Sequence, residues 1–181
     1  RPHRKQHGPA VAVRARRPPV RSTTDTRRIE QRGKAMQRVT GIGGIFFKAN
    51  DPQALAEALK EQPKLVLIET PSNPLLRVVD IQAICDASRA AGALTVVDNT
   101  FLSPALQNPL QLGADLVVHS CTKYLNGHSD VVAGTVISKT AEHATELAWW
   151  ANNIGVTAAA FDSYLLLRGL RTLTVRVKQQ Q

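Results

Sequence analysis

Three short apolar runs lie between residues 64 and 119, and each is followed by polar residues. They are KLVLIE at 64–69, LTVVD at 94–98 and ADLVVH at 114–119. A continuous apolar run, rather than an alternating one, is typical of strands buried on both faces of a parallel sheet. We therefore expect three such strands, with a fourth over 131–138 (VVAGTVIS).

The segments before the first two runs carry the period of amphipathic helices. Residues 51–62 (DPQALAEALKEQ) open with Asp-Pro, a pair suited to the N-cap and the first helical position. Residues 78–92 (VVDIQAICDASRAAG) place Asp80 as an N-cap, an apolar stripe in the first turns and Gly92 as a stop signal. The pattern predicts one helix in each segment.

The remaining helical periodicity follows the fourth strand. Residues 140–153 (TAEHATELAWWANN) and 160–178 (AFDSYLLLRGLRTLTVRVK) are interpreted as helices packing over the sheet, and 103–113 (SPALQNPLQLG) as a connection. The strand–helix–strand alternation indicates an α/β fold with a mostly parallel sheet and flanking helices on both faces. The chain reaches KQQQ without a closing element, so we expect it to be part of a larger domain.

Net charge divides the chain at about residue 50. The sequence carries 23 Lys and Arg against 14 Asp and Glu, a net charge of +9. Residues 1–50 hold 13 of these bases and two acids, a balance of +11, which leaves −2 for residues 51–181. The basic character therefore belongs to the N-terminal stretch and not to the patterned remainder.

Residues 1–38 have no helical or strand period and are rich in Arg and Pro. Such a composition buries too little apolar surface to offset chain entropy, so we expect a basic lead-in with little ordered structure. A phosphate-binding arm, a transit peptide and a stretch foreign to the following fold are three interpretations. We favour a stretch foreign to the following fold, because the basic residues follow no period that would place them on one face.

Several functional classes lack their motifs. Cys85 and Cys121 are far apart without a CxxC pair, which argues against a disulfide framework or a zinc site. No P-loop or nucleophile elbow occurs, and GIGGIF at 41–46 is interpreted as a turn. His119 and His128 have no carboxylate at metal spacing, so we expect hydrogen-bonding loop histidines. No apolar run could span a bilayer, and a reduced, cytoplasmic setting is expected.

Polar side chains follow each apolar run, at the point where a strand would end. Because ligands bind at the carboxyl ends of strands in open α/β sheets, we expect these groups to share one cleft. A lysine amine forms a Schiff base with an aldehyde, hydroxyls suit a phosphate, and a carboxylate suits a pyridinium nitrogen. This inventory fits pyridoxal phosphate (PLP). The groups are Glu69, Asp98, Asn99, Thr100, Ser120, Thr122 and Lys123.

Several motifs resemble, in order and spacing, the cysteine and methionine metabolism family of PLP enzymes. They are ETPSNPLLRVVDI (69–81), VVDNTFLSPALQNPLQLGADLV (96–117) and DLVVHSCTKYLNGHS (115–129), with similarity over roughly 50–175. The resemblance implies a fold-type I, aspartate aminotransferase-like enzyme. Residues 39–181 would form the central part of its large PLP-binding domain, and its C-terminal domain would be missing.

The resemblance also implies roles for individual residues. Lys123 would bind the cofactor aldehyde and then transfer protons, and Asp98 would pair with the pyridine nitrogen. Ser120 and Thr122 would hold the phosphate, and Asn73 would lie near the 3′-oxygen of the ring. The neighbouring residues Tyr124 and Asn126 are kept as turn structure and Cys121 as packing.

The implied activity is a γ-replacement in methionine biosynthesis. Cysteine displaces succinate from O-succinylhomoserine and gives cystathionine. The resemblance further implies a cytoplasmic enzyme that binds small-molecule amino-acid substrates and no membrane and that, when complete, is a homotetramer. The segment WWANNIG (149–155) favours this reaction. The alternatives are a cystathionine lyase, a methionine γ-lyase or a homoserine sulfhydrylase, a catalytically inactive fragment, and, ranked last, a basic-armed nucleic-acid-binding protein.

Overall fold

The computed structural model describes residues 45–46 and 52–181 of the chain. The expectations for residues 1–38 and for an N-cap at Asp51 lie outside this part. Within it, no helix combines the length and the apolar character needed to cross a membrane.

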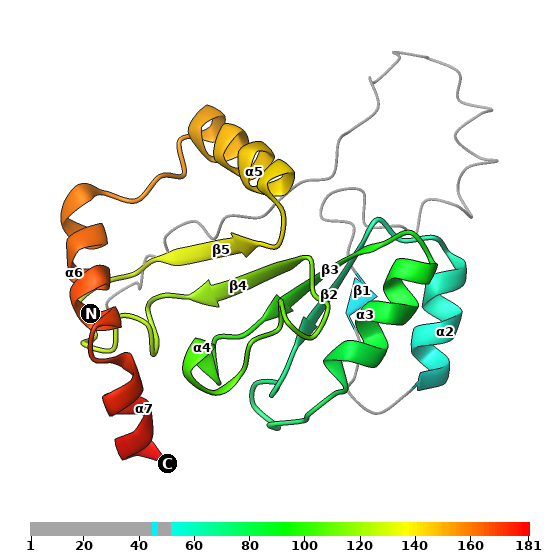
Figure 1. Cartoon of the computed structure of the whole chain (residues 1–181), viewed down its shortest axis with the longest axis horizontal. Helices are drawn as coiled ribbons and strands as arrows, with labels where there is room; N and C mark the ends of the chain where they lie inside the picture. Colours follow the sequence, from blue (N-terminus) through cyan, green and yellow to red (C-terminus); the bar gives the residue numbers. More distant parts are fainter. Residues whose placement is uncertain (1–44, 47–51) are drawn as a thin grey trace, which may run out of the picture.

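Five strands form one sheet in the order β1-β2-β3-β4-β5 (Figure 1). The first four are parallel, and β5 runs antiparallel to β4. The three expected buried strands are confirmed, and the fourth is also present although its direction is reversed. The bounds are β1 Ile45–Phe46, β2 Leu65–Glu69, β3 Leu94–Asp98, β4 Leu116–Ser120 and β5 Gly134–Ser138.

One interpretation of a short motif was wrong. Residues 45 and 46 of GIGGIF were taken as part of a turn, but they form β1. Ile45 pairs with Val66 and Phe46 with Leu67, so the two residues add a parallel strand to the edge of the sheet. A two-residue strand is too short to leave a periodic signal in the sequence.

The helices expected over 51–62 and 140–153 are present as α2 and α5, and the long C-terminal one is divided. Pro52 is the first residue of α2, and Thr140 caps α5 by accepting a hydrogen bond from the His143 N–H at 3.2 Å. The helix expected over 160–178 is interrupted after Leu170. The helices are α2 Pro52–Lys60, α3 Ile81–Ala90, α4 Ser103–Leu106, α5 Ala141–Ile154, α6 Ala160–Leu170 and α7 Leu173–Gln180.

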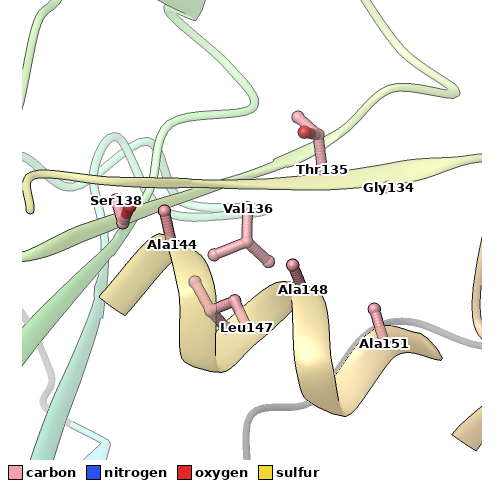
Figure 2. Close-up of a pocket in the computed structure, with 8 residues that line it drawn as sticks. All are labelled: Gly134, Thr135, Val136, Ser138, Ala144, Leu147, Ala148 and Ala151. Carbon is pink, nitrogen blue, oxygen red and sulfur yellow. The ribbon is translucent and has the colours of Figure 1, made fainter. Parts of the chain in front are cut away.

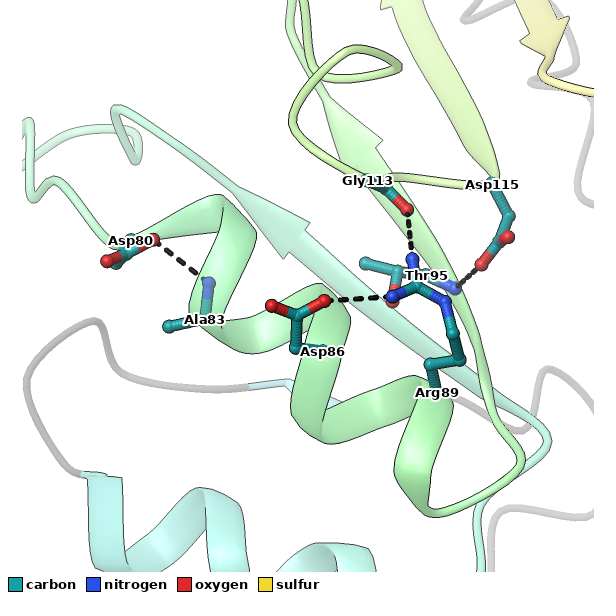
Figure 3. Close-up of polar contacts among 7 residues, drawn as sticks. All are labelled: Asp80, Ala83, Asp86, Arg89, Thr95, Gly113 and Asp115. Atoms are coloured by element: carbon teal, nitrogen blue, oxygen red, sulfur yellow. Dashed lines mark hydrogen bonds and ion pairs between the residues drawn. The ribbon is translucent and has the colours of Figure 1, made fainter.

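Both ends of α3 follow the predicted capping chemistry. The Asp80 carboxylate accepts a hydrogen bond from the Ala83 N–H at 3.0 Å (Figure 3), which satisfies one of the free donors of the first turn. Gly92 has a φ of 73° and donates its N–H to the Arg89 carbonyl, so it ends the helix in the left-handed region that favours glycine. The caps therefore fix where β3 can begin.

One face of the sheet packs against α2 and α3. Val66 and Val97, on neighbouring strands, are completely buried against the apolar stripe of α3. Burial of each such side chain contributes about 1.5–3 kcal/mol. The cluster contains Val66, Ile68, Ile81, Ile84, Cys85, Ala93, Val97 and Ala114, with Leu55, Leu59 and Val79 packed against it.

The amino ends of β3 and β4 are held by polar contacts (Figure 3). Arg89 of α3 pairs with Asp86 at 2.8 Å and donates to the Gly113 carbonyl at 3.1 Å. The Thr95 N–H donates to the Asp115 carboxylate at 2.8 Å, and the Asp115 N–H donates to the Thr95 carbonyl at 3.0 Å. These contacts lie at the opposite end of the strands from the candidate site.

The other face of the sheet carries α5. Figure 2 shows Val136 of β5 pointing toward α5 and Thr135 pointing away from it. Because Val136 pairs with Val118 and Val118 with Asp98, strand alternation places Asp98 on the same face as α5. Val117 pairs with Val97, which belongs to the α2–α3 core. Helices therefore flank both faces, as predicted.

The last helices bury less than the sequence predicts. No residue of α5 is buried, and α6 lies beyond the end of the sheet rather than over it (Figure 1). Phe161, Tyr164 and Leu167 of α6 are 68%, 60% and 61% exposed. The apolar residues of α6 are present as the pattern predicted, but these three side chains are not packed over the sheet.

Candidate functional site

The carboxyl ends of the three buried strands lie side by side, as expected. Glu69 pairs with Asp98 across β2 and β3, and Asp98 pairs with Val118 across β3 and β4. The Asn99 N–H continues this ladder by donating to the Val118 carbonyl at 3.0 Å. Parallel pairing therefore brings a carboxylate, an amide and hydroxyls to one edge of the sheet.

Hydrogen bonds connect Asp98 to Ser120 through Thr100. The Asp98 carboxylate accepts from the Thr100 N–H at 2.9 Å, and the Thr100 hydroxyl accepts from the Ser120 N–H at 2.8 Å. Only one oxygen of Asp98 is used in this way, and the side chain is half-buried. The sequence pointed to Thr100 as a strand-end residue, but not to its position between two strands.

Lys123 lies in a turn directly after β4. Its backbone N–H donates to the Ser120 carbonyl at 3.1 Å, and its carbonyl accepts from the Gly127 N–H at 2.8 Å. The side chain is exposed, and its amine has no hydrogen-bond or ion-pair partner in the part of the chain that is described. The turn therefore fixes the backbone of Lys123 and leaves the amine free.

The two predicted phosphate-binding hydroxyls differ in their surroundings. The Ser120 hydroxyl has no partner among the described residues. The Thr122 hydroxyl donates to the Ala133 carbonyl at 3.3 Å and accepts from the Ala133 N–H at 3.1 Å. A phosphate oxygen accepts hydrogen bonds only, so Thr122 would have to turn its proton away from Ala133 to bind one.

Among the described residues, no hydrogen bond or ion pair connects Asn73 to Asp98, Ser120 or Lys123. It lies exposed in the loop between β2 and α3, and that loop is held by its neighbour Ser72. The Ser72 N–H donates to the Arg77 carbonyl at 3.0 Å, and its carbonyl accepts from the Leu76 N–H at 2.7 Å. The structure thus links Asp98, Ser120 and Lys123 and leaves Asn73 on a separate loop.

Buried Asn99 and half-buried Gln107 form an amide pair next to the strand ends. Asn99 and Gln107 exchange hydrogen bonds, with the Gln107 amide donating to the Asn99 side-chain oxygen at 2.9 Å. The Gln107 amide also donates to the Thr70 carbonyl at 3.1 Å, which joins the ends of β2 and β3. The sequence did not predict a role for Gln107. It lies eight residues after Asn99, and no single helix or strand period relates the two.

The histidines divide between two environments. His128 donates a hydrogen bond from Nδ1 to the Asn126 carbonyl at 2.6 Å, as expected of a loop histidine. His119 is different, since it lies within β4, is only 5% exposed, and has an Nδ1 without a partner among the described residues. Burial lowers the pKa of His119, although the nearby charge of Asp98 opposes this shift. The expectation of a loop histidine was therefore wrong at 119.

Both cysteines are packing residues, and Cys121 is completely buried as predicted. Burial raises the pKa of Cys121 to about 11, so its thiol stays protonated beside the lysine turn. The described residues include no group of three or more His, Cys, Asp or Glu side chains that could hold a metal ion.

The residues at the strand ends fit PLP. An exposed amine, a carboxylate with one oxygen free and an unpartnered hydroxyl lie on two adjacent strand ends, and these groups match an aldehyde, a pyridinium nitrogen and a phosphate. A separate cavity of about 300 Å³ lies beneath α5 (Figure 2). It is lined mainly by small and apolar residues such as Val136, Ala144 and Leu147 and holds none of the predicted site residues.

The comparisons with known proteins agree with this chemistry. The sequence is 72% identical over 137 residues to the cystathionine gamma-synthase of Escherichia coli, which covers 76% of this chain and 36% of that protein. It is 47% identical over 148 residues to a cystathionine beta-lyase of Lactococcus lactis, which covers 80% of this chain and 39% of that protein. The chain thus spans a little over a third of the length of these relatives.

A solved structure shows the same architecture. The cystathionine gamma synthase of Xanthomonas oryzae pv. oryzae in complex with cystathionine matches with a TM-score of 0.72 and 55% identity, over 82% of this chain and 38% of that one. The profile of the Cys/Met metabolism PLP-dependent enzymes matches residues 29–181, a longer stretch than the quoted motifs cover. The chain belongs to the Cys/Met metabolism family of PLP-dependent enzymes.

Proposed function

We propose that this chain supplies the cofactor-binding part of an enzyme that performs a γ-replacement, in which cysteine displaces succinate from O-succinylhomoserine to give cystathionine. The observation that carries the proposal is the connection of Lys123 and Ser120 to Asp98 through Thr100 at adjacent strand ends. The choice of reaction rests on the 72% identity to a cystathionine gamma-synthase, against 47% for a lyase.

We propose a task for each residue, and the surroundings of Lys123, Asp98 and Ser120 support theirs. Bound PLP would act as the electron sink for carbon acids next to its imine. Lys123, with its free amine, would hold the cofactor covalently and afterwards carry protons at its Nζ. Asp98 would keep a proton on the ring nitrogen through its free carboxylate oxygen, and Ser120 would donate its hydroxyl to the phosphate. Thr122 and Asn73 are proposed as further contacts to the phosphate and the ring.

The first test is an absorbance spectrum of the full chain incubated with PLP. We expect a visible band that survives dialysis and disappears in Lys123→Ala. The matched control is Lys139→Ala, which removes another exposed lysine, located directly after β5. A band that persists in Lys123→Ala, or that is lost equally in both variants, would contradict the proposed role of Lys123.

A lyase is the second candidate function, because the L. lactis cystathionine beta-lyase matches 80% of this chain. The two reactions differ in their need for cysteine. A γ-replacement converts O-succinylhomoserine and cysteine into cystathionine and succinate, whereas a lyase consumes cystathionine and releases a thiol. Incubation with each substrate, followed by chromatography of the products, distinguishes them.

We further propose a homotetrameric, cytoplasmic assembly, in which residues 39–181 form part of the PLP-binding domain and 1–38 a separate basic segment. The exposed apolar side chains of α6, among them Phe161 and Leu167, support burial against another surface. Sedimentation velocity at several concentrations tests this. A species of four chains is expected, and a monomer at every concentration would contradict it.

A further inference from the structure

Arg176 of α7 lies over the turn that carries Lys123. Its guanidinium donates to the backbone carbonyls of the two residues that follow the lysine, Tyr124 at 2.9 Å and Leu125 at 3.5 Å. A guanidinium presents five N–H donors in a rigid plane, so one side chain holds adjacent carbonyls at a defined spacing. Arg176 thus reaches the turn across more than fifty residues of sequence.

The same guanidinium is anchored on its other side. It donates to the Gly169 carbonyl at 2.8 Å and, through Nε, to the Thr172 hydroxyl at 3.1 Å. Gly169 belongs to the last turn of α6, where a positive charge is favourable, and its carbonyl also accepts from the Thr172 N–H at 3.1 Å and the Thr172 hydroxyl at 3.2 Å. Arg176 therefore joins the end of α6, the start of α7 and the lysine turn.

Close packing leaves little freedom at this junction. A Cβ added to Gly169 would overlap the Asn126 carbonyl and lie 2.9 Å from the Asn126 Cα. A Cβ added to Gly127 would overlap the Arg176 guanidinium itself. The turn is thus pressed between α6 and Arg176, while its own N–H groups at 126 and 127 donate back to the carbonyls of Cys121 and Lys123.

We propose that Arg176 is a positioning residue for Lys123. By holding the carbonyls of residues 124 and 125 it fixes the turn over 121–127, so that the lysine amine meets the cofactor beside Asp98. Arg176 would act through this turn and not by contact with the cofactor. The inference rests on the proposed function, because it assigns Arg176 a task only if Lys123 binds PLP.

The proposal depends on the shape of the guanidinium rather than on its charge. A lysine at position 176 would keep the positive charge but lacks the planar fork that spans several carbonyls. We therefore expect Arg176→Lys to behave like Arg176→Met. Arg171, exposed and without a partner among the described residues, offers matched controls in Arg171→Lys and Arg171→Met.

The first measurement is NMR-detected hydrogen exchange on the full chain without cofactor. In both Arg176 variants the amides of Asn126 and Gly127 should exchange at least about tenfold faster than in the Arg171 variants, since their turn has lost its clamp. The amide of Val97 in the sheet should be unchanged, which shows that the fold is intact. Equal exchange at 126 and 127 in all variants would overturn the proposal.

The second measurement is the rate at which PLP becomes fixed to Lys123, trapped with borohydride and located by peptide mapping. We expect at least about a fivefold slower rate in the Arg176 variants, and a normal rate in the Arg171 variants. If trapping at Lys123 is absent even in the unaltered chain, the proposed function fails. If trapping occurs at Lys123 at the same rate in every variant, the role of Arg176 alone is refuted.

Discussion

The Thr100 hydroxyl accepts a hydrogen bond from the Ser120 N–H at 2.8 Å and so connects the ends of β3 and β4. The Thr100 N–H is in turn fixed by the Asp98 carboxylate at 2.9 Å. One short side chain thereby sets the spacing between the proposed partner of the ring nitrogen and the strand end that leads to Lys123.

Thr100→Val tests this connection, because valine keeps the shape of threonine but leaves the Ser120 N–H without an acceptor. The loss should cost about 1–2 kcal/mol of unfolding free energy, the usual penalty for an unmet, partly buried donor. Urea denaturation measures it. Thr100→Ser retains the hydroxyl and should cost clearly less, and equal losses in the two variants would show that the hydrogen bond is not the cause.

Asp98→Asn separates charge from local structure. The amide oxygen can still accept from the Thr100 N–H, so the stability should change little. A charge-assisted hydrogen bond is worth about 1.5–3 kcal/mol, so PLP affinity should fall roughly 10- to 100-fold. Titration of PLP by absorbance measures this effect.

Asp162→Asn, which removes another half-buried carboxylate in the first turn of α6, is the control for the charge change in Asp98→Asn. It should bind PLP as the unaltered chain does. Undiminished binding in Asp98→Asn would contradict the assignment of Asp98 to the ring nitrogen.

Gly169→Ala should have two opposite effects on the free energy of unfolding, and the destabilising one should be larger. Alanine improves helix propensity by about 1 kcal/mol, but its Cβ would overlap the backbone of Asn126, which cannot rotate away. Overpacking of this kind costs about 1–3 kcal/mol, so a net loss is expected on thermal or chemical unfolding.

Gly134→Ala provides the comparison for Gly169→Ala. The nearest atom to a Cβ at 134 is the His119 carbonyl at 3.7 Å, an ordinary contact, and glycine is unfavourable within a strand by about 0.5–1 kcal/mol. A small gain in stability is therefore expected. A gain at position 169 as well would show that α6 can move away from the lysine turn.

Alkaline pH should weaken the fold through Cys121. Burial raises the pKa of this thiol from 9.0 to about 11, so between these values the folded chain holds a proton that the unfolded chain has lost. Stability then falls as the pH rises, by up to about 3 kcal/mol in total. Unfolding free energies at pH 8, 9, 10 and 11 (about one-unit steps across the window) should fall less steeply in Cys121→Ala. Parallel curves for the two proteins would refute this origin.

Much of the parallel core was predictable from local signals. Continuous apolar runs marked β2, β3 and β4, and Asp80 and Gly92 marked the ends of α3, because capping and burial leave direct traces in residue type. The convergence of Asp98 and Ser120 followed from the rule that parallel strands end at one edge.

Other features depend on pairings that no local pattern records. β5 runs antiparallel to β4, with Gly134 opposite Ser120. An apolar run in the sequence does not reveal the direction of its strand. No pattern in the sequence singles out Arg176, because its acceptors are backbone carbonyls that any residue possesses. The sequence predicted that the Thr122 hydroxyl binds phosphate, whereas in the structure it bonds to the backbone of Ala133. The alanine side chain is not polar, so nothing in the sequence indicated this contact.

The antiparallel pairing of β4 with β5 has a consequence for Lys123, the proposed cofactor-binding residue. Since Ser120 and Gly134 are paired, the whole segment 121–133 leaves and rejoins the sheet at one rung. Lys123 therefore lies on a loop whose two ends are paired with each other in the sheet. Changes in the length of that loop would alter the reach of the amine while leaving the register between β4 and β5 untouched.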